Sequence, residues 1–418
     1  MRARARIGAA ARWTAAAAFV GVAVGALTVA LGWAVEASVA AFFDAQDVLK
    51  WLLPLSGAAT FGLYRLLRLD FSLGTADVIE AARASRPVPL ALAPGIFAGT
   101  CLTLLCGGSV GKEAAALQLG GSVSSHVGRF FGLGSEDCRQ TLVMCGMAAA
   151  LSAVLLAPLA AAVFVAEVMH RRLPHARCFL APAASALVSY GVARLAGARL
   201  VPLDLPPVDL AGADLLATAA LGAMAAVFAA AFCIALRTSR RQLARLGAPL
   251  LVLVTGGSLV SMVLGFTDWS PYGGTGLVQI DAALAGESLP AEAFLAKGAV
   301  TLLVLAAGLK GGEIMPVLCM GACLGSSFAA AAGLDGACMA ALGMVGLFSA
   351  CSNCPVASFI LGMELFGTAG APALLIVSLV GFALSYRCGL YQSAVIDWTP
   401  AGMLRRWRER AEGGEPRG

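Results

Sequence analysis

The sequence predicts an all-α, polytopic membrane protein, and three observations carry that prediction. Hydrophobic residues make up 59% of the 418 residues and charged residues only 13%, whereas soluble domains carry about 25% charged residues. Long apolar runs follow one another along the chain, and a stretch of the first half recurs in the second. So few charges cannot cover a water-soluble surface, which argues against a soluble enzyme, a disordered chain and a nucleic-acid-binding protein.

The apolar runs give the expected helices. They cover about residues 14–33, 50–67, 88–106, 142–167, 178–196, 210–236, 248–265, 293–309, 338–362 and 371–387. The first run is long enough to cross about 30 Å of hydrocarbon, so we interpret it as a retained membrane helix, with a cleaved signal peptide as the alternative.

Basic clusters sort the loops between these runs. Arginines gather near residues 65–68, 171–177, 237–245 and 405–410, whereas residues 202–214 and 268–272 carry Asp, Pro and aromatic side chains without Lys or Arg. The positive-inside rule places the arginine-rich loops and both termini in the cytoplasm. We therefore expect an even number of crossings and an integral membrane protein, of the inner membrane if the chain is bacterial.

An internal repeat divides the chain. GKEAAALQLGGSVSS (residues 111–125) and GMAAALSA (146–153) match GEIMPVLCMGACLGSS (312–327) and GMVGLFSA (343–350), at offsets of 201 and 197 positions. Such repeats commonly form two halves of opposite topology with a site between them. We predict halves at residues 1–245 and 246–400, followed by a short basic tail at 401–418.

Each repeat contains a Gly-rich stretch, residues 107–111 and 308–312, that leads into an apolar helix. Helix N-termini expose unpaired N–H groups and a partial positive charge, so two such ends meeting inside the membrane would bind an anion. The alternative is that these glycines only permit close helix packing.

Glu113 favours the functional reading of these glycines. It begins the first of these helices in an apolar context, and acids within a membrane are functional candidates by default. At a helix N-terminus its carboxylate would compete with an anion, and protonation would release that end. A salt bridge with Lys112 is the structural alternative. Glu313 is a further buried candidate, whereas Glu167 and Glu364 are expected to cap helices.

Tyr391 follows the last apolar run. It is either an interfacial anchor or a hydroxyl donor to the anion. The sequence indicates no cofactor and no metal site, because the twelve Cys are scattered through apolar stretches and only three His are present.

At these residues the chain resembles the CLC chloride channels and chloride/proton antiporters, over about residues 50–395. GKEAAALQLGG is similar to the family motif GREGP-x-x-Q-x-GG, APLAAAVFVAEVM to its APLAG…EE segment, and GGEIMP to its GGIFAP motif. The family's GSGIP motif falls at residues 74–77.

The resemblance implies a homodimer in the lipid bilayer, with one pathway per subunit for chloride or another small anion. It implies Glu113 as the gate and proton carrier. The anion would be bound by a set of residues from four segments: Gly74, Thr75, Gly111, Lys112, Gly312, Glu313, Ile314, Met315 and Tyr391.

Three departures qualify the resemblance. The serine and proline of GSGIP are missing, Val168 stands where many antiporters carry an inner proton-accepting glutamate, and Glu313 stands where the family usually has an apolar residue. GLKGGE and SNCP…GMELFG resemble the fluoride-exporting branch instead. Fluoride/proton exchange is therefore the alternative to chloride transport, and a cation-coupled transporter using the buried acids is a more distant one. In each case we expect a transporter or channel rather than an enzyme.

Overall fold

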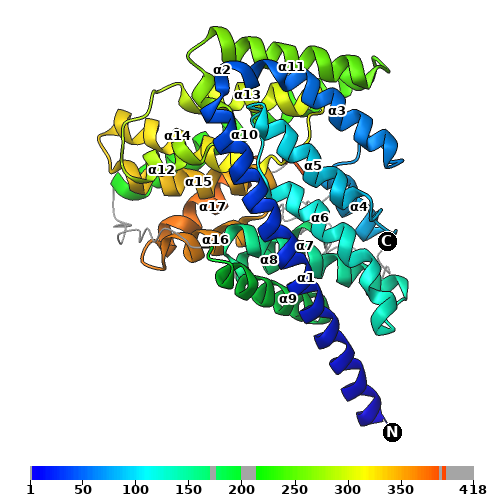
Figure 1. Ribbon diagram of the computed structural model, residues 1–418. Coiled ribbons are helices and arrows are strands. Elements are labelled where there is room, and N and C mark those ends of the chain that lie inside the picture. The colour runs from blue at the N-terminus through cyan, green and yellow to red at the C-terminus, as the bar shows by residue number, and fades with distance from the viewer. Residues whose placement is uncertain (1, 170–175, 199–212, 386–387, 392–418) are drawn as a thin grey trace, which may run out of the picture.

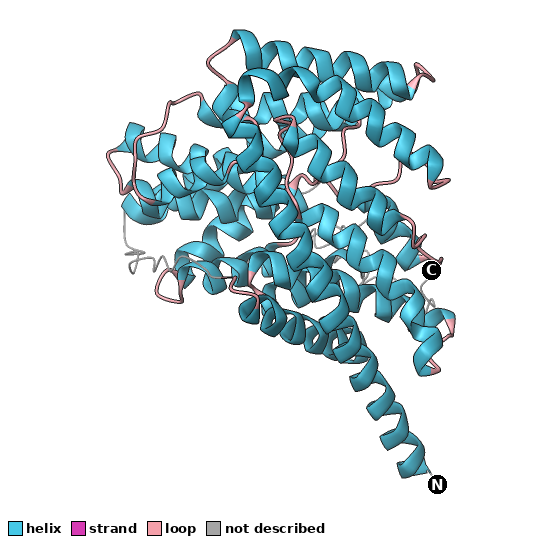
Figure 2. Cartoon of the chain, in the orientation of Figure 1, coloured by secondary structure: helices cyan, strands magenta, loops and turns pink. Residues whose placement is uncertain are grey.

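The computed structural model describes residues 2–169, 176–198, 213–385 and 388–391. Throughout these ranges the backbone is helical with short connections (Figure 2). The tail at 401–418 and most of the 202–214 loop lie outside the described residues. The helices cross at many tilts, and α1 runs diagonally over the others (Figure 1).

Nine α-helices lie in the described chain up to residue 198. Their bounds are α1 (Arg2–Asp44), α2 (Gln46–Leu49), α3 (Leu53–Leu66), α4 (Thr75–Arg83), α5 (Leu92–Leu105), α6 (Glu113–Val127), α7 (Glu136–Leu155), α8 (Pro158–Met169) and α9 (Ala176–Leu195). Two 3₁₀ turns, η1 (Lys50–Leu52) and η2 (Gly128–Phe131), extend α2 and α6.

The described chain from residue 213 onward repeats this order. Its elements are α10 (Ala213–Ala244), α11 (Pro249–Phe266), η3 (Ser270–Tyr272), α12 (Leu277–Leu284), α13 (Ala293–Ala307), α14 (Ile314–Ala332), α15 (Gly336–Ser352), α16 (Pro355–Phe366) and α17 (Ala371–Ser385). Helices α5 and α13 begin 201 positions apart, as do α6 and α14, so the offset found in the sequence recurs in the fold.

Two expected helices are each two helices, which corrects the runs at 142–167 and 338–362. The breaks fall at Leu156 and Asn353, which adopt left-handed conformations with φ of 53° and 57°. Pro158 and Pro355 then begin the next helices, where a missing N–H removes no hydrogen bond. Hydropathy averaged over a whole run does not register these breaks, because one or two residues change it little in an otherwise apolar stretch.

The first helix is also longer than the run at 14–33. Helix α1 is 43 residues long, far more than the roughly 20 residues that cross hydrocarbon. Five described helices are long and apolar enough to span a membrane, α1 and α10 among them. Other apolar helices in the described chain are shorter, at 10–17 residues.

Glycines let the helices of each repeat cross at backbone contact. A Cβ on Gly120 of α6 would lie 2.2 Å from the Gly146 oxygen of α7. A Cβ on Gly321 of α14 would lie 2.5 Å from the Gly343 oxygen of α15. The matched glycines of the repeat therefore serve the close packing that small residues give to membrane helices.

Glu167 and Glu364 cap helices of the opposite repeat. The Glu364 carboxylate accepts hydrogen bonds from the N–H groups of Leu159 (3.0 Å) and Ala160 (2.8 Å) at the start of α8. The Glu167 carboxylate accepts them from Val356 (3.2 Å) and Ala357 (2.8 Å) at the start of α16. The expected capping role thus has a definite form, in which each repeat satisfies the other's helix N-terminus.

Large apolar side chains lie exposed along several helices, with Phe266 77% and Val227 72% accessible. Water would make such a surface unfavourable, whereas lipid would not. The exposed apolar faces and the spanning helices together describe an integral membrane protein.

Candidate functional site

The two Gly-rich segments meet at the centre of the fold. The Gly111 N–H donates to the Gly312 oxygen at 2.6 Å, and the Gly312 N–H donates to the Gly111 oxygen at 2.7 Å. This pair is the one isolated β-bridge in the described chain. It ties the start of α6 to the start of α14, so both helix N-termini lie at the same point.

Only glycine fits at either position of this bridge. A Cβ on Gly312 would lie 2.8 Å from the Ala114 nitrogen in the first turn of α6. A Cβ on Gly111 would lie 2.7 Å from the Met315 Cβ and 2.4 Å from a Glu113 carboxylate oxygen. Contacts of that length are too short for real atoms, so the bridge requires both glycines.

In the bridge, the N–H groups of Gly111 and Gly312 are each used in a hydrogen bond to the other residue's carbonyl oxygen. The first-turn amides that follow have no partner within their own helix. In α14 these are the amides of Ile314 and Met315, since the first helical bond is donated by Val317 to the Glu313 oxygen. In α6 the corresponding bond runs from Ala116 to the Lys112 oxygen. Two sets of amides therefore face one small region.

Glu113 lies in this region and is fully buried. The backbone amides of Lys112, Glu113 and Met315 surround its carboxylate, but neither carboxylate oxygen makes a hydrogen bond. A buried carboxyl group without partners costs several kcal/mol if charged, on the order of 3–5. Uptake of a proton, or a movement of the side chain to hydrogen-bond donors, would therefore remove this free-energy cost.

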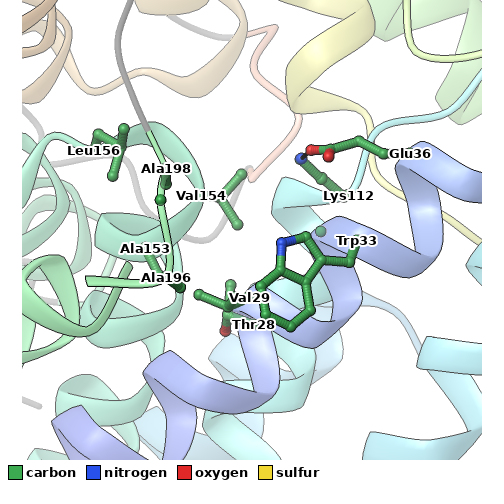
Figure 3. A pocket seen from close by; sticks show the side chains of 12 residues that line it. Thr28, Val29, Trp33, Glu36, Lys112, Ala153, Val154, Leu156, Ala196 and Ala198 are labelled. Carbon is green, nitrogen blue, oxygen red and sulfur yellow. Dashed lines mark hydrogen bonds and ion pairs between the residues drawn. The ribbon is translucent and has the colours of Figure 1, made fainter. Parts of the chain in front are cut away.

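Lys112 turns away from Glu113, so the predicted alternative of a Lys112–Glu113 salt bridge is wrong. Its Nζ is 3.0 Å from a Glu36 carboxylate oxygen of α1. Both side chains line a cavity of about 340 Å³, which we call the Trp33 pocket. Figure 3 shows Lys112 and Glu36 together, with the Trp33 indole beside them and Ala153, Leu156 and Ala198 across the pocket.

A second cavity, of about 590 Å³, lies on the other side of the helix starts. We call it the Tyr391 pocket. The predicted site residues that line it are Gly74, Thr75, Glu313 and Tyr391. Glu113 lines neither pocket. Its neighbour in the chain, Lys112, lines the Trp33 pocket, and Glu313 at the start of α14 lines the Tyr391 pocket. Glu113 therefore lies between the two pockets.

Tyr391 is buried rather than interfacial, with 2% of its surface accessible. Its ring stands edge-on to Phe164 with centroids 6.2 Å apart. The hydroxyl faces Glu313 but makes no hydrogen bond of normal geometry. An unpaired buried O–H is a donor available to an anion or a water molecule.

Polar groups of the segment at 70–77 are already engaged in hydrogen bonds, most of them within the segment. The Gly74 N–H donates to Asp77 Oδ2 at 2.9 Å, and the Thr75 hydroxyl accepts a hydrogen bond from Gln118 at 3.0 Å. Hydrogen bonds from the Ser72 N–H and hydroxyl lower the pKa of Asp70, which lies between α3 and α4. Asp77, where the family motif has proline, therefore caps α4 and occupies the Gly74 amide.

Arg83 of α4 contacts the end of α8. Its guanidinium donates to the Val168 oxygen. A cation at a helix C-terminus is favourable. At Val168, where the resemblance leads us to expect an inner glutamate in other antiporters, this chain therefore has an apolar side chain with a positive charge next to it.

Sequence reasoning missed the cations of the Tyr391 pocket. Lys310, Arg237, Arg240 and Arg241 all line it. Lys310 Nζ donates to the oxygens of Phe71 and Leu73 and lies 4.1 Å from the Phe71 ring centroid. The three arginines are spaced i, i+3, i+4, which would have indicated one helix face, but nothing in the sequence placed that face over the site.

Fold and site together define a membrane transport protein with an anion-type site at paired helix starts. The sequence profile described as voltage gated chloride channel matches residues 56–386. That span is most of the chain, so the protein belongs to the CLC family of voltage-gated chloride channels.

Individual relatives agree with this assignment. The chain is 28% identical to a chloride/fluoride channel protein of Pseudomonas syringae pv. tomato, covering 82% of this chain and 77% of that protein. It is 27% identical to the H(+)/Cl(-) exchange transporter ClcA of Yersinia pestis, covering 84% and 79%.

Solved structures have the same fold. A crystal structure of a CLC-type fluoride/proton antiporter superimposes with a TM-score of 0.87 at 27% identity, covering 91% of this chain and 96% of that one. A slow cyanobacterial Cl⁻/H⁺ antiporter gives 0.79 at 20% identity, covering 96% and 98%. The chain is an all-α CLC-type protein, and its function is anion transport across a membrane.

Proposed function

We propose that the protein carries chloride through a path from the Tyr391 pocket to the Trp33 pocket, with Glu113 as its gate. The observation that carries this proposal is the Gly111–Gly312 bridge, which holds the N-termini of α6 and α14 together. Unpaired amides from both helices surround one point, and that point favours negative charge without a fully charged cation.

Glu113 supplies the gate in this proposal. Its carboxylate occupies the electropositive region that a permeating anion would need. When the carboxylate takes up a proton it no longer competes for the amides, and the side chain is free to move. The same residue then carries the proton if transport is coupled.

The remaining roles follow from position. Tyr391 and the amides of Ile314 and Met315 bind the anion on one side of Glu113. Lys112 attracts it on the other side, once separated from Glu36. We further propose that the protein is a homodimer in a bacterial inner membrane with cytoplasmic termini, which places the arginine-rich Tyr391 pocket on the cytoplasmic side.

Chloride efflux from proteoliposomes tests the proposed function. We expect the purified protein to release entrapped chloride when a potassium ionophore carries the counter-ion. A protein that retains both chloride and fluoride would contradict it.

Glu113→Gln tests the gate in the same assay. The amide has nearly the same shape as the protonated acid but cannot release a proton, so we expect efflux that no longer depends on pH. Glu80→Gln, an exposed change on α4, is the matched control and should keep the wild-type pH profile. A pH profile of Glu113→Gln equal to that of the wild type would remove Glu113 from the mechanism.

Fluoride/proton exchange is the second candidate, and Glu313 favours it. This acid lines the Tyr391 pocket next to the unpaired Tyr391 hydroxyl, where it would repel a diffuse anion and provide a proton site for exchange. Val168 removes the alternative inner acid. Fluoride efflux several times faster than chloride efflux, with proton uptake in the opposite direction, would favour this candidate over the first.

A further inference from the structure

We propose that the arginines of α10 form an anion-capture site in the Tyr391 pocket, which concentrates the transported anion before it reaches Tyr391. This inference rests on the proposed function and adds side chains to it. Arg237, Arg240 and Arg241 carry the site, with Lys310 at its inner end.

The three arginines form one positive wall. Their spacing of i, i+3 and i+4 puts them on one face of α10 within about 6 Å along the axis, and all three line the cavity. Arg237 donates to the Gly389 oxygen at 3.4 Å, two residues before Tyr391. The row of arginines therefore begins next to the chain segment that carries Tyr391.

Arg240 is held in place through one nitrogen only. Its Nε donates to the Leu305 oxygen at 3.2 Å, and its two terminal nitrogens have no protein acceptor in the described chain. It lies close enough to Tyr391 and Lys310 to interact with both electrostatically. A guanidinium with donors to spare, beside the Lys310 amine, forms a favourable place for a small anion.

The acids of the pocket make no ion pair with these arginines in the described chain. Asp70 accepts from Ser72, and Asp77 accepts from Gly74. These two acids, before and within α4, act electrostatically on Lys310 rather than on the arginines. Ion pairs in the described residues are Lys50–Asp47 and Lys112–Glu36, neither of them in this pocket. Glu313 lies deeper, beside Tyr391.

The positive-inside rule alone does not account for this arrangement. It explains an arginine anywhere in the loop after α10, and Arg245 is such a residue, exposed and not part of the pocket lining. It does not require three arginines to face the cavity that leads to the helix starts.

The test compares charge-removing variants on the last turns of α10 and directly after it, in the full-length reconstituted protein. Initial chloride flux is measured over a chloride series in Arg240→Gln, Arg241→Gln and the control Arg245→Gln. At low ionic strength we expect the first two to raise the half-saturating chloride concentration about twofold to threefold each, with an unchanged maximal rate. The control should match the wild type.

Two further measurements separate charge from fold. Arg240→Lys keeps the charge and should restore the wild-type half-saturating concentration. An impermeant salt at about 1 M reduces the screening length to about 3 Å. Under that condition the half-saturating chloride concentrations of Arg240→Gln and wild type should become equal.

The outcomes are distinct for the two proposals. Equal half-saturating concentrations in Arg240→Gln and wild type, or an equal shift in Arg245→Gln, would overturn the capture site and leave the proposed function standing. A wild-type protein without anion flux would overturn both.

Discussion

At the scale of single residues, two glycines and one glutamate determine the structure of the proposed site. Gly111 and Gly312 are tied by two short hydrogen bonds, and Glu113 lies buried against them without a hydrogen-bond partner. The glycines allow two helix ends to touch, and the acid then occupies the field that those ends create.

Gly312→Ala should abolish anion flux and lower the melting temperature of the detergent-solubilised protein. The added methyl group would lie 2.8 Å from backbone and side-chain atoms of Ala114, and such overpacking costs about 1–3 kcal/mol. Flux and thermal unfolding are measured on the same preparation.

Gly134→Ala is the matched control for that substitution, because a Cβ there meets no atom within 4 Å. We expect it to leave both properties unchanged. Wild-type flux in Gly312→Ala would mean that the helix starts do not need their close contact.

At the scale of helices, the exchange of caps between α8 and α16 connects the two repeats. Each helix carries, two residues before its last, a glutamate that satisfies the first N–H groups of the other helix. A helix N-terminus inside a membrane has no water to bond, so an uncapped one is costly. The two helices therefore stabilise each other's ends as a pair.

Glu364→Gln should lower the stability of the fold by about 1–2 kcal/mol, since a neutral amide accepts weaker hydrogen bonds and offers one oxygen where the carboxylate offers two. We expect a lower melting temperature in detergent, and the same direction for Glu167→Gln. The exposed Glu80→Gln should shift stability by less than about 0.5 kcal/mol. Unchanged melting in both cap variants would show that these hydrogen bonds do not stabilise the pair.

At the scale of the whole molecule, one chain holds a complete site. Both helix starts, both pockets and Tyr391 come from the same chain. If two chains associate, as we propose, each therefore brings its own pathway, and no residue needs to be borrowed from a neighbour.

Mixed dimers test this independence. Dimers assembled from one wild-type chain and one Gly312→Ala chain should carry about half the flux of wild-type dimers, because one intact pathway remains. Single-dimer vesicles give the clearest measurement. Complete loss of flux in such dimers would mean that the two chains form one shared pathway.

The sequence predicted the repeat and the helix starts well, because constant offsets and Gly-rich segments are local patterns. It did not reveal the breaks at Leu156 and Asn353, since a left-handed residue in an apolar run leaves hydropathy unchanged. It also could not pair Lys112 with Glu36, which lies 76 positions away. Likewise, the arginines of α10 were visible only as a basic cluster until the fold placed them over a cavity.

Lys112 and Glu313 occupy equivalent positions in the two repeats, 201 residues apart, each at the N-cap of its helix. One opens to the Trp33 pocket and the other to the Tyr391 pocket. A basic and an acidic residue therefore stand at matching positions of the two repeats. Under the proposed pathway, an anion that enters from one side passes an amine first and an anion from the other side passes a carboxyl group first, so we expect the two directions of transport to differ in rate.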